Sequence, residues 1–335
     1  MLHDVKHKVD EPPPPATGKY QIQEGRVFVR VDPTPTRINS LAFSKDGKLL
    51  AAAKDYGRIV VWDVTSKSVL CVIDTGFTRV GLVAISPDSH FVAATQLIGG
   101  GIRIWQVPDG KQVSSIDAGN PVISRLFYAS NPDRLIFSTL GTYVLDPASG
   151  AHIAEFPGER MPVLSTDGST LMTESNSEVV LRRVSDWKQQ RTLPRLTPYE
   201  WPVFMDTARG LFLFGDGTDS HLFVVARLSD GQISPHVKLA NLPKSTALYE
   251  TSAFAAIDPH SGLLFGHSGD QLWALDPKTG HTCLSKNLLS VSGAISPDGS
   301  FLAGAEDSPT PTEDQNAAGV AIWKTDGLAK ACHLQ

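Results

Sequence analysis

The chain has 335 residues, of which 41% are hydrophobic, and this is enough to bury a substantial core. Only 19% of the residues are charged, while 28 glycines and 23 prolines supply many turns, as in proteins built from short strands. The formal net charge of −5 offers no general attraction for phosphate, so nucleic acid is not an expected partner.

The chain begins with a polar segment, residues 1–19, that contains four consecutive prolines at Pro12–Pro15. We expect this segment to be an extended, disordered tail, followed by one folded domain over residues 20–335. The segment has no apolar stretch typical of a signal peptide, and no run in the chain approaches the ~20 apolar residues that cross a bilayer. The sequence therefore predicts a cytoplasmic protein without a membrane partner. An exported protein whose signal peptide has been removed stays an alternative.

Two stretches early in the chain, Ile38–Ile73 and Val80–Ile116, follow the same order of strands and turns. Each has an apolar strand, a turn with Ser and Asp, a second apolar strand, a turn with Gly, a third strand that ends near a Trp, and a fourth strand. The two tryptophans, Trp62 and Trp105, stand 43 residues apart. A repeat of roughly 40–45 residues with four strands is typical of a β-propeller blade.

The rest of the chain divides into repeats of similar length, each with a turn after its first strand. Ser, Asn or Asp opens these turns because its side chain can bond its own backbone, and Gly then adopts positive φ. The turn residues are Ser44, Ser86, Asn131, Ser165, Asp206, Asp258 and Ser296. We predict an all-β, seven-bladed propeller with four antiparallel strands in each blade. The blades are Arg37–Asp74, Thr78–Ala118, Pro121–Phe156, Met161–Leu193, Trp201–Leu239, Thr251–Leu288 and a seventh from Val291.

The segment Arg26–Val31 alternates like a strand but precedes the first complete repeat. The seventh repeat has three clear strands and a weak fourth at Leu328–Gln335. An unsealed ring exposes strand edges that promote aggregation. We therefore predict that the N-terminal strand supplies the missing outer strand and closes the ring.

The segment Phe43–Asp63, which ends in the dipeptide Trp62-Asp63, is similar to a blade of the WD-repeat β-propellers. The resemblance extends over Arg37–Gly327, although the Gly-His dipeptide of that family is absent and the repeats are degenerate. Two later segments instead resemble the blade sequences of lactonase-like and quinoprotein-like propellers, namely Leu145–Gly150 and Leu275–Gly280. Membership of the WD-repeat propellers implies a rigid ring whose loops carry the function.

In a propeller, the residues just before each first strand surround one mouth of the central channel. In this chain such positions hold arginines along one arc, and glutamates with aromatic residues along the other. Arg, Trp and Tyr at a pocket mouth are the residue types that contribute most binding energy. The candidate binding residues are Arg37, Arg79, Arg160, Glu200, Trp201, Tyr249 and Glu250.

The sequence contains no nucleophile elbow, zinc-protease motif or P-loop, and its three cysteines lack metal-ligand spacing, so we expect no catalytic residue, metal or cofactor. The favoured interpretation is a non-catalytic, monomeric scaffold that presents its channel mouth to a protein or peptide. One alternative is a lactonase-like enzyme, in which Arg37, Arg79 and Arg160 hold an anionic substrate and Glu200 or Glu250 is the general base. Another is an exported propeller that assists a redox complex.

Overall fold

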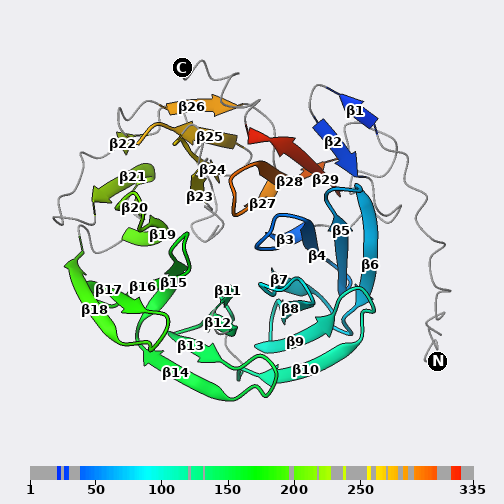
Figure 1. The fold of residues 1–335 in the computed structure, drawn as a ribbon, viewed down its shortest axis with the longest axis horizontal. Helices are drawn as coiled ribbons and strands as arrows, with labels where there is room; N and C mark the ends of the chain where they lie inside the picture. Colours follow the sequence, from blue (N-terminus) through cyan, green and yellow to red (C-terminus); the bar gives the residue numbers. More distant parts are fainter. Residues whose placement is uncertain are drawn as a thin grey trace, which may run out of the picture.

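The computed structural model describes residues 21–23, 26–29, 38–119, 122–130, 133–195, 200–216, 219–227, 237–238, 255–257, 262–268, 271–277, 282–285, 290–307 and 318–325. Every regular element in these ranges is a β-strand. The strands form small antiparallel sheets that stand like blades around a central axis, with the first strand of each sheet nearest the centre (Figure 1). The predicted all-β propeller is therefore confirmed.

Six of the sheets have four strands each, numbered outward from the centre. Three of them contain β3 (Ile38–Phe43), β4 (Leu49–Lys54), β5 (Arg58–Asp63) and β6 (Ser68–Asp74); β7 (Val80–Ile85), β8 (Phe91–Gln96), β9 (Gly101–Gln106) and β10 (Gln112–Asp117); and β11 (Arg125–Ala129), β12 (Arg134–Ser138), β13 (Gly141–Leu145) and β14 (His152–Pro157). The next three contain β15 (Arg160–Leu164), β16 (Thr170–Glu174), β17 (Glu178–Arg183) and β18 (Gln189–Pro194); β19 (Glu200–Asp206), β20 (Leu211–Asp216), β21 (Asp219–Arg227) and β22 (Val237–Lys238); and β23 (Ala255–Ile257), β24 (Leu264–Ser268), β25 (Gln271–Leu275) and β26 (Thr282–Ser285).

One further sheet has five strands and joins the two ends of the described chain. It contains β27 (Ser290–Ile295), β28 (Phe301–Asp307), β29 (Ala318–Lys324), β2 (Arg26–Val29) and β1 (Gln21–Gln23). β2 pairs antiparallel with β29, so that Val27 lies opposite Ile322. The prediction that the N-terminal strand pairs with the last repeat is therefore confirmed.

The turn after the first strand has the same hydrogen bonds in four sheets, at the buried serines Ser44, Ser86, Ser165 and Ser296. Each serine hydroxyl donates to the aspartate two residues later at 2.5–2.6 Å. Each also accepts the backbone N–H five residues later at 2.9 Å. A single hydroxyl thus binds both the aspartate of the turn and the first backbone N–H of the second strand. The corresponding Asp206 accepts the backbone N–H of Arg209, while Asn131 and Asp258 lie outside the described residues.

The aspartates of these turns are held as anions. Burial alone would raise the pKa of Asp167, but hydrogen bonds from Ser165 and from the backbone and side chain of Ser169 lower it to about 2. The carboxylate therefore keeps its role as acceptor in mildly acidic solution. The same balance of burial and hydrogen bonds lowers the pKa of Asp46, Asp88 and Asp298.

The hydrophobic core lies between neighbouring sheets rather than within one of them. Trp62 of β5 packs in a cluster with Ala303 and Ile322 of the sheet that precedes it around the ring. Trp105 of β9 packs in the next cluster with Ile59 and Val61 of β5. In these two sheets the third strand therefore packs its large side chain against the preceding sheet.

The three predicted tryptophans occupy the same place in their sheets. Trp62 lies opposite Leu50, Trp105 opposite Val92 and Trp323 opposite Leu302, and in each case the partner is the second residue of the second strand. Their exposed fractions are 2%, 2% and 6%. The prediction that these tryptophans are equivalent and mostly buried is confirmed.

We expect Trp62→Ala to lower the free energy of unfolding by about 3–5 kcal/mol, because truncation leaves a cavity between two sheets. Urea unfolding followed by circular dichroism measures this loss. Tyr56→Ala is the matched control, since Tyr56 is 76% exposed and should lose less than about 0.5 kcal/mol. A loss below about 1 kcal/mol for Trp62→Ala would show that this position does not hold the sheets together.

Deletion of residues 1–32 should lower the melting temperature sharply and promote association, because it removes β2 and exposes the edge of β29. Deletion of residues 1–19 leaves β1 and β2 in the chain and should have no effect on melting. Differential scanning calorimetry and light scattering compare the two proteins. Equal melting of both would mean that closure does not depend on β2.

Candidate functional site

We call one end of the ring the mouth: the end at which each first strand begins and each second strand turns into the third. The predicted Arg79 lies here, directly before β7. Arg160 is exposed and is the first residue of β15, while Glu200 and Trp201 are the first two residues of β19. The strands thus begin slightly earlier than predicted, because pairing with the second strand already includes Arg160 and Glu200.

The structure tests only part of the predicted binding set. The side chains of Glu200 and Trp201 are not among those described, and Arg37, Tyr249 and Glu250 lie outside the described residues altogether. Their place at the mouth therefore stays a prediction. The two arginines that are described, Arg79 and Arg160, lie in different sectors of the mouth and have different surroundings.

Arg79 is fixed between two neighbouring sheets. Its Nε donates to Asp55 Oδ1 at 2.9 Å, and Asp55 lies in the turn between β4 and β5. Asn39 of β3 donates from Nδ2 to the same carboxylate oxygen at 2.9 Å and to the backbone oxygen of Val80 at 2.8 Å. The backbone oxygen of Arg79 accepts from Leu97 N–H in the turn between β8 and β9 at 3.0 Å. This network neutralises the charge of Arg79 and ties two successive turns together.

A second charged group lies at the mouth in the β11–β18 sector. Glu174, the last residue of β16, is buried and lies 3.5 Å from Arg195, a nearly buried arginine that directly follows β18. Arg160 lies opposite Glu174 in the strand register. Arg125, the first residue of β11 in the preceding sheet, also interacts electrostatically with Glu174. Of these residues the sequence predicted only Arg160, because no motif marks the others.

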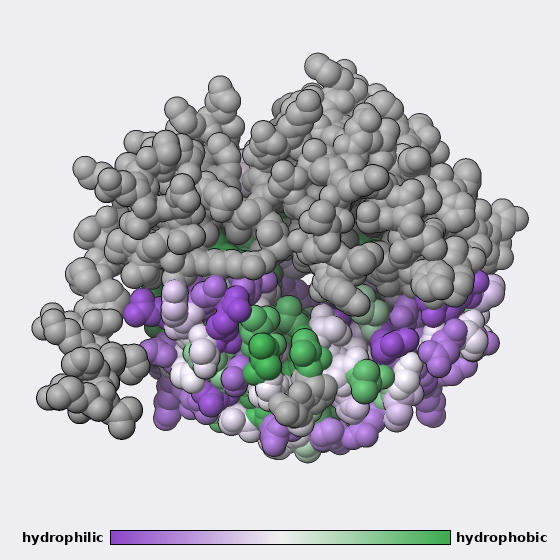
Figure 2. All heavy atoms as spheres, turned by 180° about the vertical axis from the view of Figure 1, so that it is seen from behind, coloured by the Kyte–Doolittle hydropathy of each residue, from purple (hydrophilic) through white to green (hydrophobic). Residues whose placement is uncertain are grey.

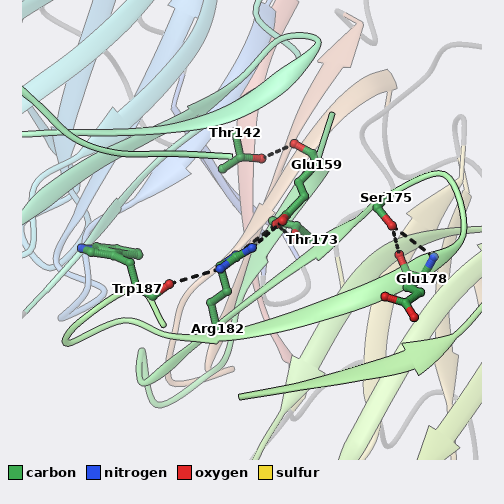
Figure 3. Close-up of polar contacts among 7 residues, drawn as sticks. All are labelled: Thr142, Glu159, Thr173, Ser175, Glu178, Arg182 and Trp187. Atoms are coloured by element: carbon green, nitrogen blue, oxygen red, sulfur yellow. Dashed lines mark hydrogen bonds and ion pairs between the residues drawn. The ribbon is translucent and has the colours of Figure 1, made fainter. Parts of the chain in front are cut away.

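Glu159, next to Arg160, is held away from the mouth by a buried ion pair (Figure 3). Arg182 of β17 donates to it twice, from Nη2 at 2.5 Å and from Nε at 3.1 Å. Thr173 of β16 donates to Glu159 Oε2 at 2.7 Å, and Thr142 of β13 donates to the Glu159 backbone oxygen at 2.8 Å. The network therefore joins the β11–β14 sheet to the β15–β18 sheet beside Arg160.

Arg182 occupies the place that a tryptophan fills in other sheets. It lies opposite Leu171, the second residue of β16, as Trp62 lies opposite Leu50. Its guanidinium lies 4.1 Å from the centre of the Phe156 ring, in the preceding sheet. In this sheet a stacked, bidentate arginine thus replaces the apolar contact of the indole.

Four large apolar side chains are exposed at the mouth. Tyr56, Ile98 and Leu140 stand in the turns between second and third strands of three successive sheets, with exposed fractions of 76%, 72% and 76%. Val122, 63% exposed, lies in the link that leads to β11. These residues were not predicted from the sequence, although an apolar residue recurs at the same turn in three repeats and could have indicated an exposed apolar surface. A group of exposed large apolar side chains is typical of an interaction surface.

Strand pairing and backbone hydrogen bonds connect neighbouring turns and links into one arc along the mouth. Arg79 bridges the first two turns, and Gly100 of the second turn accepts a backbone hydrogen bond from Ala118 at 3.2 Å. The β11–β12 pairing is continued by the hydrogen bond from Ser124 N–H to the Ser138 oxygen, so the link that holds Val122 enters β11 at the same end as the turn that holds Leu140. On the face shown in Figure 2, hydrophobic side chains gather near the middle of the view, between hydrophilic ones.

Among the described residues, no group of three or more His, Cys, Asp and Glu side chains could hold a metal ion. Within the same residues, no helix is long and apolar enough to cross a membrane. The two buried carboxylates near the mouth, Glu159 and Glu174, each form an ion pair with an arginine. These pairs fix the frame of the mouth.

We expect Glu159→Gln to cost about 3 kcal/mol of unfolding free energy, because it leaves the mostly buried Arg182 without its carboxylate. The double variant Glu159→Gln/Arg182→Met should recover part of this loss. Asp186→Asn is the matched control, since its pair with Arg183 is exposed and contributes less than about 1 kcal/mol. Equal losses for the two single variants in urea unfolding would contradict the assigned role of Glu159.

Comparison with known proteins adds independent information on the repeat. The family model described as "WD domain, G-beta repeat" matches residues 28–63. Part of the chain is similar to Protein FIZZY-RELATED 3 of Arabidopsis thaliana, with 25% identity over 158 residues, which are 43% of this chain and 32% of that protein. The B-type cell cycle switch protein ccs52B of Medicago truncatula has 27% identity over 158 residues, with the same two shares.

Periodic tryptophan protein 2 of Saccharomyces cerevisiae is 27% identical over 132 residues, which are 38% of this chain and 14% of that protein. The matches thus span about a third or less of the length of these relatives. The matched repeat lies where the strand order and the buried Trp62 indicate a propeller blade. Taken with the ring of antiparallel sheets, these similarities show that the chain is a WD-repeat β-propeller.

Proposed function

We propose that this protein is a non-catalytic scaffold that binds a protein or peptide at the mouth of its ring. The observation that supports this most is the position of the four most exposed large apolar side chains in the described residues, Tyr56, Ile98, Val122 and Leu140. All four lie at the mouth, on turns and a link rather than on strands. The proposed binding surface therefore consists of turns and a link, which are carried by a rigid frame of strands.

The apolar residues, rather than the charges, supply the affinity in this proposal. The partly exposed Arg79–Asp55 ion pair contributes little to the free energy of binding. Solvent screens exposed ion pairs, so that each contributes about 0–1 kcal/mol. Burial of one large apolar side chain contributes about 1.5–3 kcal/mol. A partner that covers several of the apolar turns gains enough to offset the loss of freedom on association.

The comparisons support a scaffold over an enzyme. Binding of protein partners is typical of WD-repeat propellers, and two of the three relatives are named for a switch in the cell cycle and for periodic tryptophans. The lactonase-like alternative gains no support from them. The chain matches only part of each relative, so a specific partner does not follow from their names.

We also propose that the ring has seven blades, that β2 seals it and that the protein is a monomer. One five-stranded and six four-stranded sheets among the described strands support the number of blades. The pairing of β2 with β29 supports the seal. The cytoplasmic location inferred from the polar first residues stays a prediction.

Affinity capture with the purified full chain tests the proposed function. We expect Ile98→Ser/Leu140→Ser to reduce retention of the partner roughly tenfold or more, because two apolar contacts are lost. Leu70→Ser/Val72→Ser is the matched control, since both residues are exposed on β6, an outer strand of the ring. Quantitative mass spectrometry compares the retained proteins, and thermal melting confirms that the variants are folded. Equal retention by all three proteins would contradict binding at the mouth.

A further inference from the structure

Tyr56 differs from the other exposed residues of the mouth. Among the exposed large hydrophobic side chains of the described ranges it is the aromatic one, with 76% of its surface exposed. Its backbone has a positive φ of 60°, and Gly57 follows with 72°. Residues other than glycine rarely adopt this left-handed conformation, and those that do gather at functional sites. The turn therefore holds an aromatic ring outward at a cost in backbone energy.

Both neighbours of Tyr56 are fixed by hydrogen bonds. Asp55 accepts from Arg79 Nε at 2.9 Å. The Gly57 oxygen accepts twice from Thr75, from its N–H at 2.8 Å and from its Oγ1 at 2.6 Å. A Cβ at position 57 would lie 2.0 Å from a backbone oxygen of the link between β6 and β7, so that only glycine fits there. A rigid turn thus carries the exposed ring, and a ligand that binds the ring loses little affinity to ordering of the protein.

The N-terminal segment enters the ring at the mouth. Gln21, the first residue of β1, lies opposite Phe28, while Gln23 lies opposite Arg26. Arg26 in turn lies opposite Trp323, near the end of β29 that is farther from the mouth. The strand β1 therefore starts on the side of the mouth. The residues that precede Gln21 lie outside the described ranges, and the chain connects them to the fold at this side.

The sheet that contains β1 packs against the sheet that contains Tyr56 (Figure 1). β1 is the fifth strand of its sheet counted outward, whereas Tyr56 lies between the second and third strands of the next sheet. Strands lie about 4.8 Å apart and packed sheets about 10 Å apart, so the separation is on the order of 15–20 Å. Pro15 precedes Gln21 by six residues. Such a stretch spans up to about 20 Å when it is extended, so Pro12–Pro15 can reach Tyr56.

A run of prolines suits an exposed aromatic ring. Prolines favour the polyproline II conformation before they bind, so little conformational freedom is lost on binding. Surfaces with aromatic side chains bind such segments in many recognition domains. Because this segment belongs to the same chain, its effective concentration at the mouth is in the mM range, and a weak contact is enough to hold it there.

We propose that residues 1–19 fold back over the mouth and that Pro12–Pro15 packs on Tyr56. This inference rests on the proposed function and adds a regulation of the same site, because the bound segment covers one of the four apolar positions that the partner uses. A segment that is bound about half of the time changes the folding equilibrium only about twofold. Removal of residues 1–19 therefore leaves the melting temperature nearly unchanged, although it frees the mouth.

Photo-crosslinking in the full chain tests this contact. Benzoylphenylalanine at position 56 keeps an aromatic ring there, and mass spectrometry of the digested monomer identifies the peptide joined to it. We expect an adduct with the peptide that contains Pro12–Pro15. Thr65 is the matched control, since it is exposed between β5 and β6 at the opposite end of the same sheet. An unbound segment of this length reaches up to about 60 Å and would label both positions, so a bound one should label position 65 roughly fivefold less.

Replacement of Pro12–Pro15 by serines should reduce the adduct at position 56 roughly fivefold, because serine offers no ring to pack on the aromatic face. The same protein should retain roughly twice as much partner in affinity capture, since its mouth is free more of the time. Lys6→Ser/Lys8→Ser is the matched control, because it changes the same segment and keeps the prolines. It should leave both the adduct and the retention as they are. Thermal melting checks that each variant is folded.

Failure of this inference is distinguishable from failure of the function on which it rests. Absence of the adduct with residues 1–19, or equal adducts at positions 56 and 65, would overturn the inference. An adduct with residues 30–37, which link β2 to β3, or one that joins two copies of the chain would do the same. The proposed function then still stands if Ile98→Ser/Leu140→Ser loses the partner. Equal retention of the partner with and without the prolines would overturn the competition for the mouth.

Discussion

The contact between neighbouring sheets, made at one position of the third strand, is the constraint on which the rest of the ring depends. A four-stranded sheet has two faces to bury, and each is covered only by the sheet beside it. Trp62 and Trp105 meet this need with a buried indole against the preceding sheet. Because these sheets are fixed to their neighbours in this way, the turns at their ends are held in place by the packing of the strands that they connect.

Arg182 shows that the same position accepts different chemistry. Its stacking on Phe156 and its two bonds to Glu159 join the sheets where a tryptophan is absent. This choice has a consequence for the surface, because it draws Glu159 inward while Arg160 stays exposed. The packing of this sheet thus holds one carboxylate away from the exposed Arg160. Ion pairs of this kind need good geometry to offset their desolvation, and the bidentate arrangement with support from Thr173 provides it.

Much of the fold could be predicted from local sequence patterns, whereas much of the site could not. The Ser-x-Asp turns were readable because one hydroxyl makes both bonds within six residues, as at Ser44. The pairing of β2 followed from counting strands. Arg79 and Arg160 lie at the start of first strands, and the gathering of the predicted residues at the mouth stays a prediction. Asp55, the partner of Arg79, was not predicted, because it comes from the preceding repeat and its approach depends on how the sheets pack.

The central claim is that a partner sits on the apolar turns at the mouth. Photo-crosslinking tests it most directly, with a photoreactive residue placed in the full chain at Leu140 and, in a separate protein, at Val72 on the outer strand β6. Both side chains are exposed, so both probes are equally able to react. The account predicts a discrete adduct with a partner protein from position 140 and none from position 72. A discrete adduct from position 72 alone would place the working surface on the rim and contradict it.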